Sequence, residues 1–347
     1  MENTEQIKKT RSKVYRRYNW MSVVLLFQFL GVSVGVVLLQ TVTAAIKSAV
    51  TGDNSPLTAD YSTFFNGVAC IVVNTLFAML VLKITKTGKL RESFAKPSFS
   101  AIEIAMGAFM VMGFSYFYSM IVSAFESVFS STAKAVGQSL GSGLESQNLV
   151  LQIGTLAYLC VLGPITEELL FRSCVLRAGS HVSRKVGVIA SALLFGLFHG
   201  NIAQFFNTFV MGLVLAYVTV KSRSIIPAII AHICNNSSTI IVMYIKMAVG
   251  ESNYATVDTV SRVVLIALGI VSAIFILRKY KLIDDNADKI PVNLPATEEE
   301  IEQAKTPKNK LIEDFFFGFV FVIIVKYWTC ICVISIEEIL SVYDREP

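Results

Sequence analysis

The chain has 347 residues, of which 54% are hydrophobic and only 16% are charged, and its formal net charge is +5. Soluble domains carry about 25% charged residues, so this composition, with its long apolar runs, argues against a water-soluble globular protein and favours a membrane protein. The six cysteines all lie in apolar segments without the spacing of a disulfide framework or a zinc knuckle, so we expect them to be small packing residues.

The first apolar run, residues 20–46, follows a basic segment that resembles the start of a signal peptide. The run is longer than the roughly 7–15 apolar residues of a signal peptide, so we predict a retained first span. A span needs about 20 mostly apolar residues. Further spans are predicted at 62–84, 101–125, 149–176, 186–200, 205–220, 225–247 and 259–277.

The predicted spans at 186–200 and 205–220 are short and are separated only by Gly200–Gln204, a pattern typical of helices that end inside a membrane. A ninth apolar stretch, 315–336, follows the charged segment Lys279–Asp314 and can span the membrane, lie at its surface or pack loosely. The fold class is therefore all-α: a polytopic membrane helix bundle with about eight core transmembrane helices and a candidate ninth.

We divide the chain into an N-terminal part with three spans (1–148), a central part (149–250) and a C-terminal part with the last core helix, a charged linker and the final apolar stretch (251–347). Basic loops alternate with loops poor in positive charge along all eight spans. We therefore expect a multi-pass protein of the cell membrane, with its N-terminus in the cytoplasm and the Ser- and Gly-rich segment Ser131–Ser146 outside.

Three charged residues, Glu167, Glu168 and Arg172, interrupt the fourth apolar run. Each charge at the centre of a span costs roughly 2.5–3.5 kcal/mol, and such charges are tolerated only where they face protein or a water-filled cavity. Glu168 and Arg172 are four residues apart, so they share a helix face and can pair. Glu167 is turned about 100° away and can face a cavity. The three charges are thus a candidate functional site.

Two histidines, His199 and His232, also lie inside predicted spans, whereas His181 lies in a basic loop and is expected to be solvated. From the helical rise, Glu167 lies about 15 Å deep, His199 about 20 Å, His232 about 12 Å and Asn236 about 18 Å. His232 and Asn236 are four residues apart and can address one substrate or one water.

These residue types favour hydrolysis. A glutamate can act as a general base on water, imidazole can hold a metal or share proton transfer, and an amide can stabilise an oxyanion. Glu167, His199 and His232 are also candidate zinc ligands, although no H-E-x-x-H motif occurs. The metal-dependent and metal-free arrangements both stay open, with a slight preference for the metal-free one. The structural alternative is an ion pair and histidines that only join helices.

At these positions the chain resembles the CPBP intramembrane protease family, also called the Abi or type II CAAX prenyl protease family. The family pattern is E-E-x-x-x-R, then F-x-x-x-H, then H-x-x-x-N/D. The sequence has Glu167-Glu168-x-x-x-Arg172, Phe195-x-x-x-His199 and His232-x-x-x-Asn236, all within about residues 149–250.

The resemblance implies an eight-helix membrane core and peptide-bond hydrolysis in the membrane. It implies Glu167 as the base that activates water, His199 as the residue that binds or polarises that water, and His232 and Asn236 as oxyanion stabilisers. Glu168 and Arg172 would support the site. Relatives cut prenylated C-terminal tripeptides, or are linked to bacteriocin maturation, self-immunity or membrane-protein processing.

We therefore expect an intramembrane endopeptidase whose partners are a peptide or membrane-protein substrate and the lipid bilayer, with no nucleic acid. Two other classes stay open. One is a transporter or channel that uses Glu167, His199 and His232 as a proton relay, although no inverted repeat is visible in the sequence. The other is a non-enzymatic immunity protein that keeps the motifs as scaffold.

Overall fold

The computed structural model describes residues 2–124, 144, 146–180, 184–199 and 202–283. Contacts divide the chain into two compact units, one of Leu30–Leu294 and one of Met1–Phe29 with Pro295–Pro347. The second of these units contributes only the start of α1 to the described residues. Outside the described residues lie His181, Cys330, Cys332, the ninth apolar stretch 315–336, and most of both the charged linker and the Ser131–Ser146 segment.

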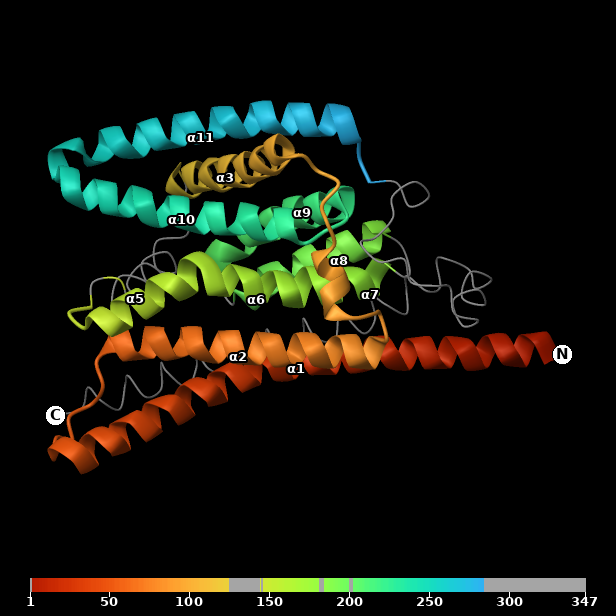
Figure 1. Ribbon diagram of the computed structural model, residues 1–347, viewed down its shortest axis with the longest axis horizontal. Helices are drawn as coiled ribbons and strands as arrows, with labels where there is room; N and C mark the ends of the chain where they lie inside the picture. Colours follow the sequence, from red (N-terminus) through yellow and green to blue (C-terminus); the bar gives the residue numbers. More distant parts are fainter. Residues whose placement is uncertain (1, 125–143, 145, 181–183, 200–201, 284–347) are drawn as a thin grey trace. The chain divides into compact units, whose positions relative to one another are not determined.

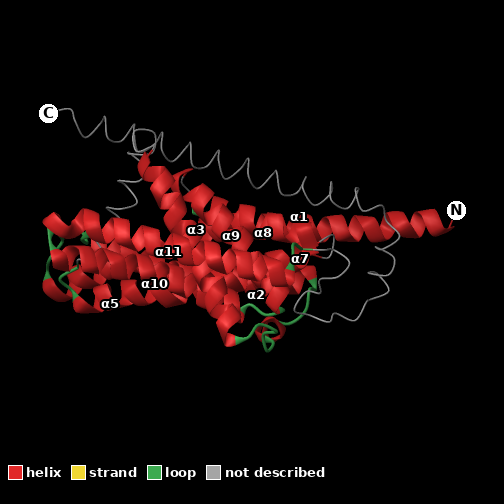
Figure 2. Ribbon diagram, turned by 90° about the horizontal axis from the view of Figure 1, so that it is seen from above, coloured by secondary structure: helices red, strands yellow, loops and turns green. Residues whose placement is uncertain are grey.

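The described residues form helices and no strand, as Figures 1 and 2 show. The predicted all-α class is therefore confirmed. The helices are α1 (Glu2–Thr51), α2 (Ala59–Thr85), η1 (Leu90–Phe94), α3 (Ala101–Ala124), α5 (Leu149–Ala157), η2 (Tyr158–Leu162), α6 (Gly163–Leu170), η3 (Phe171–Leu176), α7 (Arg177–Ser180), α8 (Arg184–Phe198), α9 (Ile202–Ser222), α10 (Ile226–Val249) and α11 (Glu251–Tyr280).

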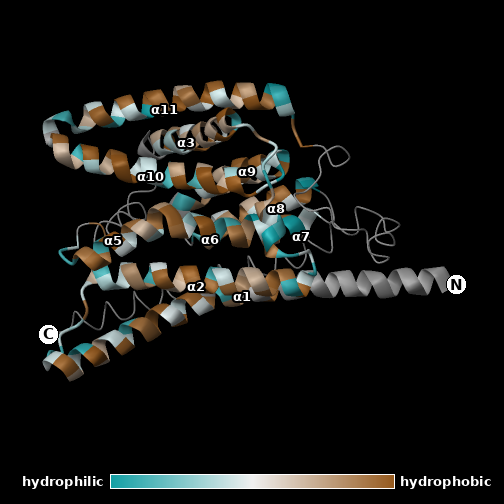
Figure 3. Ribbon diagram, viewed as in Figure 1, coloured by the Kyte–Doolittle hydropathy of each residue, from teal (hydrophilic) through white to brown (hydrophobic). Residues whose placement is uncertain are grey.

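Seven helical segments among the described residues are long and apolar enough to cross a membrane. Hydrophobic residues cover most of α2 and α11, as Figure 3 shows. Helix α8 has only 15 residues, fewer than the roughly 20 that a span needs, and is not among these seven segments, whereas the other short predicted span, 205–220, is among them. The chain is thus a multi-pass membrane protein. The seven segments are 30–51, 59–85, 101–121, 149–180, 204–222, 226–249 and 252–280.

The segment that carries the two glutamates is a continuous helix with two π-helical turns, η2 and η3, on either side of α6. Gly163 N–H donates to the Tyr158 carbonyl, five residues back, in place of an α-helical bond. Pro164 follows at once and has no N–H to donate. The π-turn η2 therefore lies directly on the N-terminal side of Pro164. Such turns are frequent at functional sites.

Within the unit Leu30–Leu294, the glutamate-bearing α6 packs between α2 and α10, while α8 and α9 contact η3 just beyond it. Helix α3 packs against α10 and α11 and extends the bundle away from α6 (Figure 1). This arrangement surrounds α6 with protein, which is the condition under which charges are tolerated at membrane depth.

Arg177, at the end of the same helix, ties down the connection between α2 and α3. Its guanidinium donates to the Lys89 carbonyl at 3.3 Å, to Ser93 Oγ at 3.0 Å and to Glu92 Oε2 at 3.0 Å. Partial burial alone would raise the pKa of Glu92, but hydrogen bonds from Lys89 N–H and Arg177 outweigh it, so the pKa lies below its usual value. The contacts fix one end of the helix that carries the glutamates.

Candidate active site

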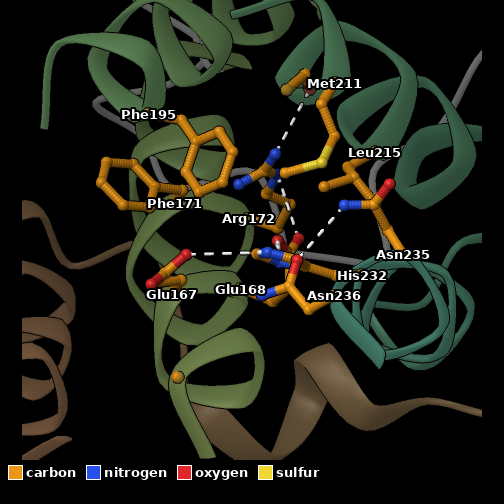
Figure 4. A network of polar contacts seen from close by, with 12 residues as sticks. Glu167, Glu168, Phe171, Arg172, Phe195, Met211, Leu215, His232, Asn235 and Asn236 are labelled. Atoms are coloured by element: carbon orange, nitrogen blue, oxygen red, sulfur yellow. Dashed lines mark hydrogen bonds and ion pairs between the residues drawn. The ribbon is translucent and has the colours of Figure 1, made fainter. Parts of the chain in front are cut away.

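Glu168 is the centre of a buried polar network (Figure 4). Its Oε2 lies 3.1 Å from Arg172 Nε, in the pair predicted from their spacing, and both side chains have no exposed surface. Its Oε1 lies 3.0 Å from Nδ1 of His232 on α10. The carboxylate therefore joins two helices whose paired residues are 64 positions apart in the sequence.

The Arg172 guanidinium is enclosed on its remaining sides. It lies over the Phe195 ring, 4.5 Å from the centroid, and its Nη2 donates to the Gly212 carbonyl at 3.4 Å. A buried charge needs a partner and further hydrogen bonds to offset the loss of hydration. Glu168 supplies the countercharge, while α8 and α9 supply the aromatic face and the carbonyl. Arg172 is thus a structural tie for three helices.

His232 has a defined orientation and tautomer. A carboxylate only accepts hydrogen bonds, so the Nδ1 atom beside Glu168 must carry the proton. In the neutral ring, Nε2 then carries a lone pair. This Nε2 lies 3.8 Å from Glu167 Oε2. His232 therefore has one nitrogen held by Glu168 and the other directed to Glu167.

Glu167 differs from its neighbour in exposure, because its side chain is 20% accessible whereas that of Glu168 is fully buried. The 3.8 Å separation from His232 is too long for a direct hydrogen bond. Glu167 thus presents a carboxylate that is partly open to solvent and near an imidazole lone pair. This is the arrangement expected of a general base that acts on water.

His199 lies at the end of α8, and its imidazole packs against Phe195, the same ring that His232 contacts. The Phe195 ring meets His199 edge-to-face at 5.0 Å and His232 at 5.6 Å. Nδ1 of His199 lies 2.9 Å from the Phe195 carbonyl. Because a carbonyl only accepts, this nitrogen carries the proton and Nε2 has the lone pair when the ring is neutral. Phe195 therefore sets the spacing of both imidazoles, a role that its place in the sequence pattern did not reveal.

Asn236 contacts the π-turn before the glutamates. Its Nδ2 donates to the Leu159 carbonyl at 3.0 Å. In a regular α-helix Gly163 N–H would bind that carbonyl, but it donates to Tyr158 instead, and Pro164 offers no N–H. Asn236 therefore satisfies a carbonyl that the π-turn leaves without a backbone donor. One of its two amide protons is used in this contact.

Among the residues that the structure describes, no three His, Cys, Asp or Glu side chains are placed to hold one metal ion together. The candidate ligands Glu167 and His232 approach each other to 3.8 Å. His199, the third, packs edge-to-face with the Phe195 ring, as His232 also does. The donor set in this conformation therefore does not form a three-ligand zinc site.

The comparison with known families agrees with these positions. Residues 149–238 match the family described as type II CAAX prenyl endopeptidase Rce1-like. The matched segment runs from α5 to α10 and contains all six candidate residues. The resemblance inferred from the three motifs is confirmed over this part of the chain. No curated protein and no solved structure matches the chain.

Within this Rce1-like segment, the pairing of Glu168 with Arg172 was predictable from their spacing and is confirmed. Two features were not predictable. The first is that Glu168 also holds His232, because their contact joins separate helices. The second is the use of Asn236 on the Leu159 carbonyl, which depends on the π-turn. The Rce1-like match supports a CAAX endopeptidase, and the catalytic roles of the individual residues stay predictions.

Proposed function

We propose that the protein is an intramembrane endopeptidase that hydrolyses peptide bonds of membrane-associated or lipidated proteins, with Glu167 as the base that activates water. The observation that carries the proposal is the contrast inside the glutamate pair. Glu168 is buried and held by Arg172 and His232, whereas Glu167 is partly exposed and faces the free nitrogen of His232. The Rce1-like match supports the same reaction class.

The proposed reaction begins when Glu167 takes a proton from water and the oxygen adds to the carbonyl carbon of the substrate. The resulting oxyanion accepts a hydrogen bond from the second amide proton of Asn236, and the C–N bond then breaks. The leaving amine receives the proton that Glu167 took. His199 holds the attacking water in place. The reaction needs no reactant other than water and the peptide, because the proton taken from water is returned to the leaving amine.

His232 can serve in two stages of this sequence. With Nδ1–H bound to Glu168, its Nε2 is an acceptor while the ring is neutral. If it shares the proton taken from water, it becomes an imidazolium whose charge Glu168 stabilises, and its Nε2–H can then donate to the oxyanion. Glu168 and Arg172 are positioning residues in this scheme, because they act through His232.

The proposed substrate class rests on the matched family, which is described as type II CAAX prenyl endopeptidase. We therefore propose a prenylated cysteine followed by a C-terminal tripeptide as the substrate. Bacteriocin maturation and self-immunity are further candidates for the physiological role. We also propose the cell membrane as the location.

The decisive test uses purified protein in liposomes and a quenched fluorescent peptide that carries a farnesylated cysteine before its last three residues. We expect cleavage by the wild type and none by Glu167→Gln, because the amide cannot accept the proton. Glu251→Gln, at the start of α11, is the matched control and should cleave normally. Full activity of Glu167→Gln would contradict the proposal. Proton-coupled transport without cleavage would favour a transporter, and immunity retained by Glu167→Gln would favour a non-enzymatic role.

The metal requirement has its own test. We propose a metal-free mechanism, because Asn236 is a good oxyanion donor and a poor zinc ligand. Purified active protein should contain less than one zinc per chain, and activity should survive chelation. Stoichiometric zinc, with activity lost on stripping and restored by zinc, would show instead that Glu167, His199 and His232 gather around a metal.

A further inference from the structure

Tyr158, the first residue of the π-turn η2, lies in a slot made by two glycines. A Cβ atom on Gly67 of α2 would be 2.7 Å from Tyr158 Cγ, closer than real Cβ contacts allow. A Cβ on Gly163 would be 3.1 Å from Tyr158 Cε2. The ring therefore occupies the space that side chains at both positions would need, and its orientation is fixed from two sides.

The direction of this ring is informative. Because Cε2 lies beside Gly163, five residues further along the helix, the ring extends toward the C-terminal end. Gly163 and Glu167 are four residues apart and share a helix face. The hydroxyl beyond Cε2 is thus directed along the face that carries the Glu167 carboxylate.

The π-turn makes this alignment possible. Glu167 follows Tyr158 by nine residues, and at about 100° per residue a regular α-helix would place them on opposite faces. A π-turn accommodates one extra residue, which reduces the angular separation to about 80°. The sequence periodicity alone therefore conceals the relation between these two side chains.

The electrostatic contacts agree with the geometry. The Tyr158 hydroxyl lies beside the Cys70 side chain of α2, and both groups are within electrostatic range of the Glu167 carboxylate. Tyr158 and Glu167 are both described residues, and no direct hydrogen bond joins them. Thiol sulfur is a weak hydrogen-bond acceptor. The Glu167 carboxylate, or a water molecule bound to that carboxylate, is a stronger acceptor and therefore competes with Cys70 for the Tyr158 hydroxyl proton.

We propose that Tyr158 is a further positioning residue of the site, whose hydroxyl orients the Glu167 carboxylate by hydrogen bonding through a bridging water molecule. The carboxylate is then held between Tyr158 on one side and His232 Nε2 on the other. Gly67 and Gly163 leave the space that the Tyr158 ring occupies, and the π-turn brings this ring toward the helix face of Glu167. The role in water activation rests on the proposed function, whereas the contact with Glu167 does not.

The contact can be measured without any substrate. Infrared spectroscopy of the protein in liposomes would identify the carboxyl stretching bands of Glu167 by their absence in Glu167→Gln. We expect Tyr158→Phe to shift these bands in frequency, because removal of the hydroxyl changes the hydrogen bonding of the carboxyl group. Tyr116→Phe is the matched control. Its buried hydroxyl has no hydrogen-bond partner among the described residues, so the bands should stay in place. Unchanged bands in Tyr158→Phe would overturn the proposal.

The catalytic part is tested with the farnesylated peptide. Tyr158→Phe keeps the ring in its slot, so we expect an unchanged unfolding temperature and KM and about a tenfold lower kcat. Tyr116→Phe should match the wild type in both parameters. If Glu167→Gln loses cleavage while Tyr158→Phe retains the full kcat, the role of Tyr158 in water activation is wrong and the proposed function stands. If Glu167→Gln cleaves normally, the proposed function fails, and the infrared result still decides the contact.

Discussion

The adjacent side chains of Glu167 and Glu168 differ in burial, because successive residues of a helix point about 100° apart. Glu168 points into protein, where Arg172 and His232 use both of its oxygens. Glu167 is partly exposed, and its carboxylate lies 3.8 Å from Nε2 of His232. Identical residue types can thus divide structural and catalytic work according to burial and partners.

The stability of the network provides a prediction at this scale. Glu168→Gln removes the countercharge of the buried Arg172 and should lower the free energy of unfolding by about 3–5 kcal/mol, the range for breaking a buried pair. Glu167→Gln leaves that pair intact and should change stability little. Thermal unfolding of both variants in detergent measures the difference. Equal destabilisation of the two variants would contradict the division of labour.

At the scale of the helices, the contact between α3 and α11 depends on small residues. Gly113 of α3 and Gly269 of α11 meet directly, and a Cβ added to either would lie 2.6 Å from the Cα of the other. A side chain at either position would push two backbones apart, since neither has a flexible end that can move aside. The packing of α11 on α3 therefore depends on this glycine pair, while α6 depends on the π-turns that flank it.

A matched pair of glycine substitutions tests this contact. Gly269→Ala should destabilise the protein by roughly 1–3 kcal/mol, as overpacking does elsewhere. Gly107→Ala, also on α3, places its Cβ 3.5 Å from Val218 Cγ2, an ordinary contact distance. The control should be neutral or stabilising by up to about 1 kcal/mol, because alanine favours helix more than glycine. Unfolding temperatures in detergent that fall equally for both variants would refute the proposed backbone contact.

At the scale of the whole molecule, the alternation of basic loops predicts how the helices are oriented relative to the membrane. The connection between α2 and α3 carries several exposed basic residues, including Lys96, and is held to the end of the glutamate-bearing helix by Arg177. We propose that this connection faces the cytoplasm together with the N-terminus.

Cysteine labelling in intact cells tests the orientation. In a chain without its native cysteines, Ser142→Cys should react with a membrane-impermeant reagent from outside. Lys96→Cys should react only after the membrane is opened, because it lies on the other side. The reverse pattern would show that the chain is inserted in the opposite direction.

The sequence alone determined the features that depend on local pattern. The length of the apolar runs predicted a polytopic helical membrane protein, because each span must satisfy its own backbone hydrogen bonds in lipid. The four-residue spacing of Glu168 and Arg172 predicted their pair, because that spacing fixes a shared helix face. The three motifs predicted the family resemblance that residues 149–238 confirm.

Only the tertiary structure decided the contacts between distant segments. The bond from His232 to Glu168, the enclosure of Arg172 by Phe195 and Gly212, and the bond from Asn236 to Leu159 each join separate helices. Their formation depends on how helices pack, which the periodicity of one segment does not encode. The π-turn at Tyr158–Leu162 changes that periodicity itself. It moves Tyr158 toward the face of Glu167 and leaves the Leu159 carbonyl for Asn236, because one backbone hydrogen bond spans five residues instead of four.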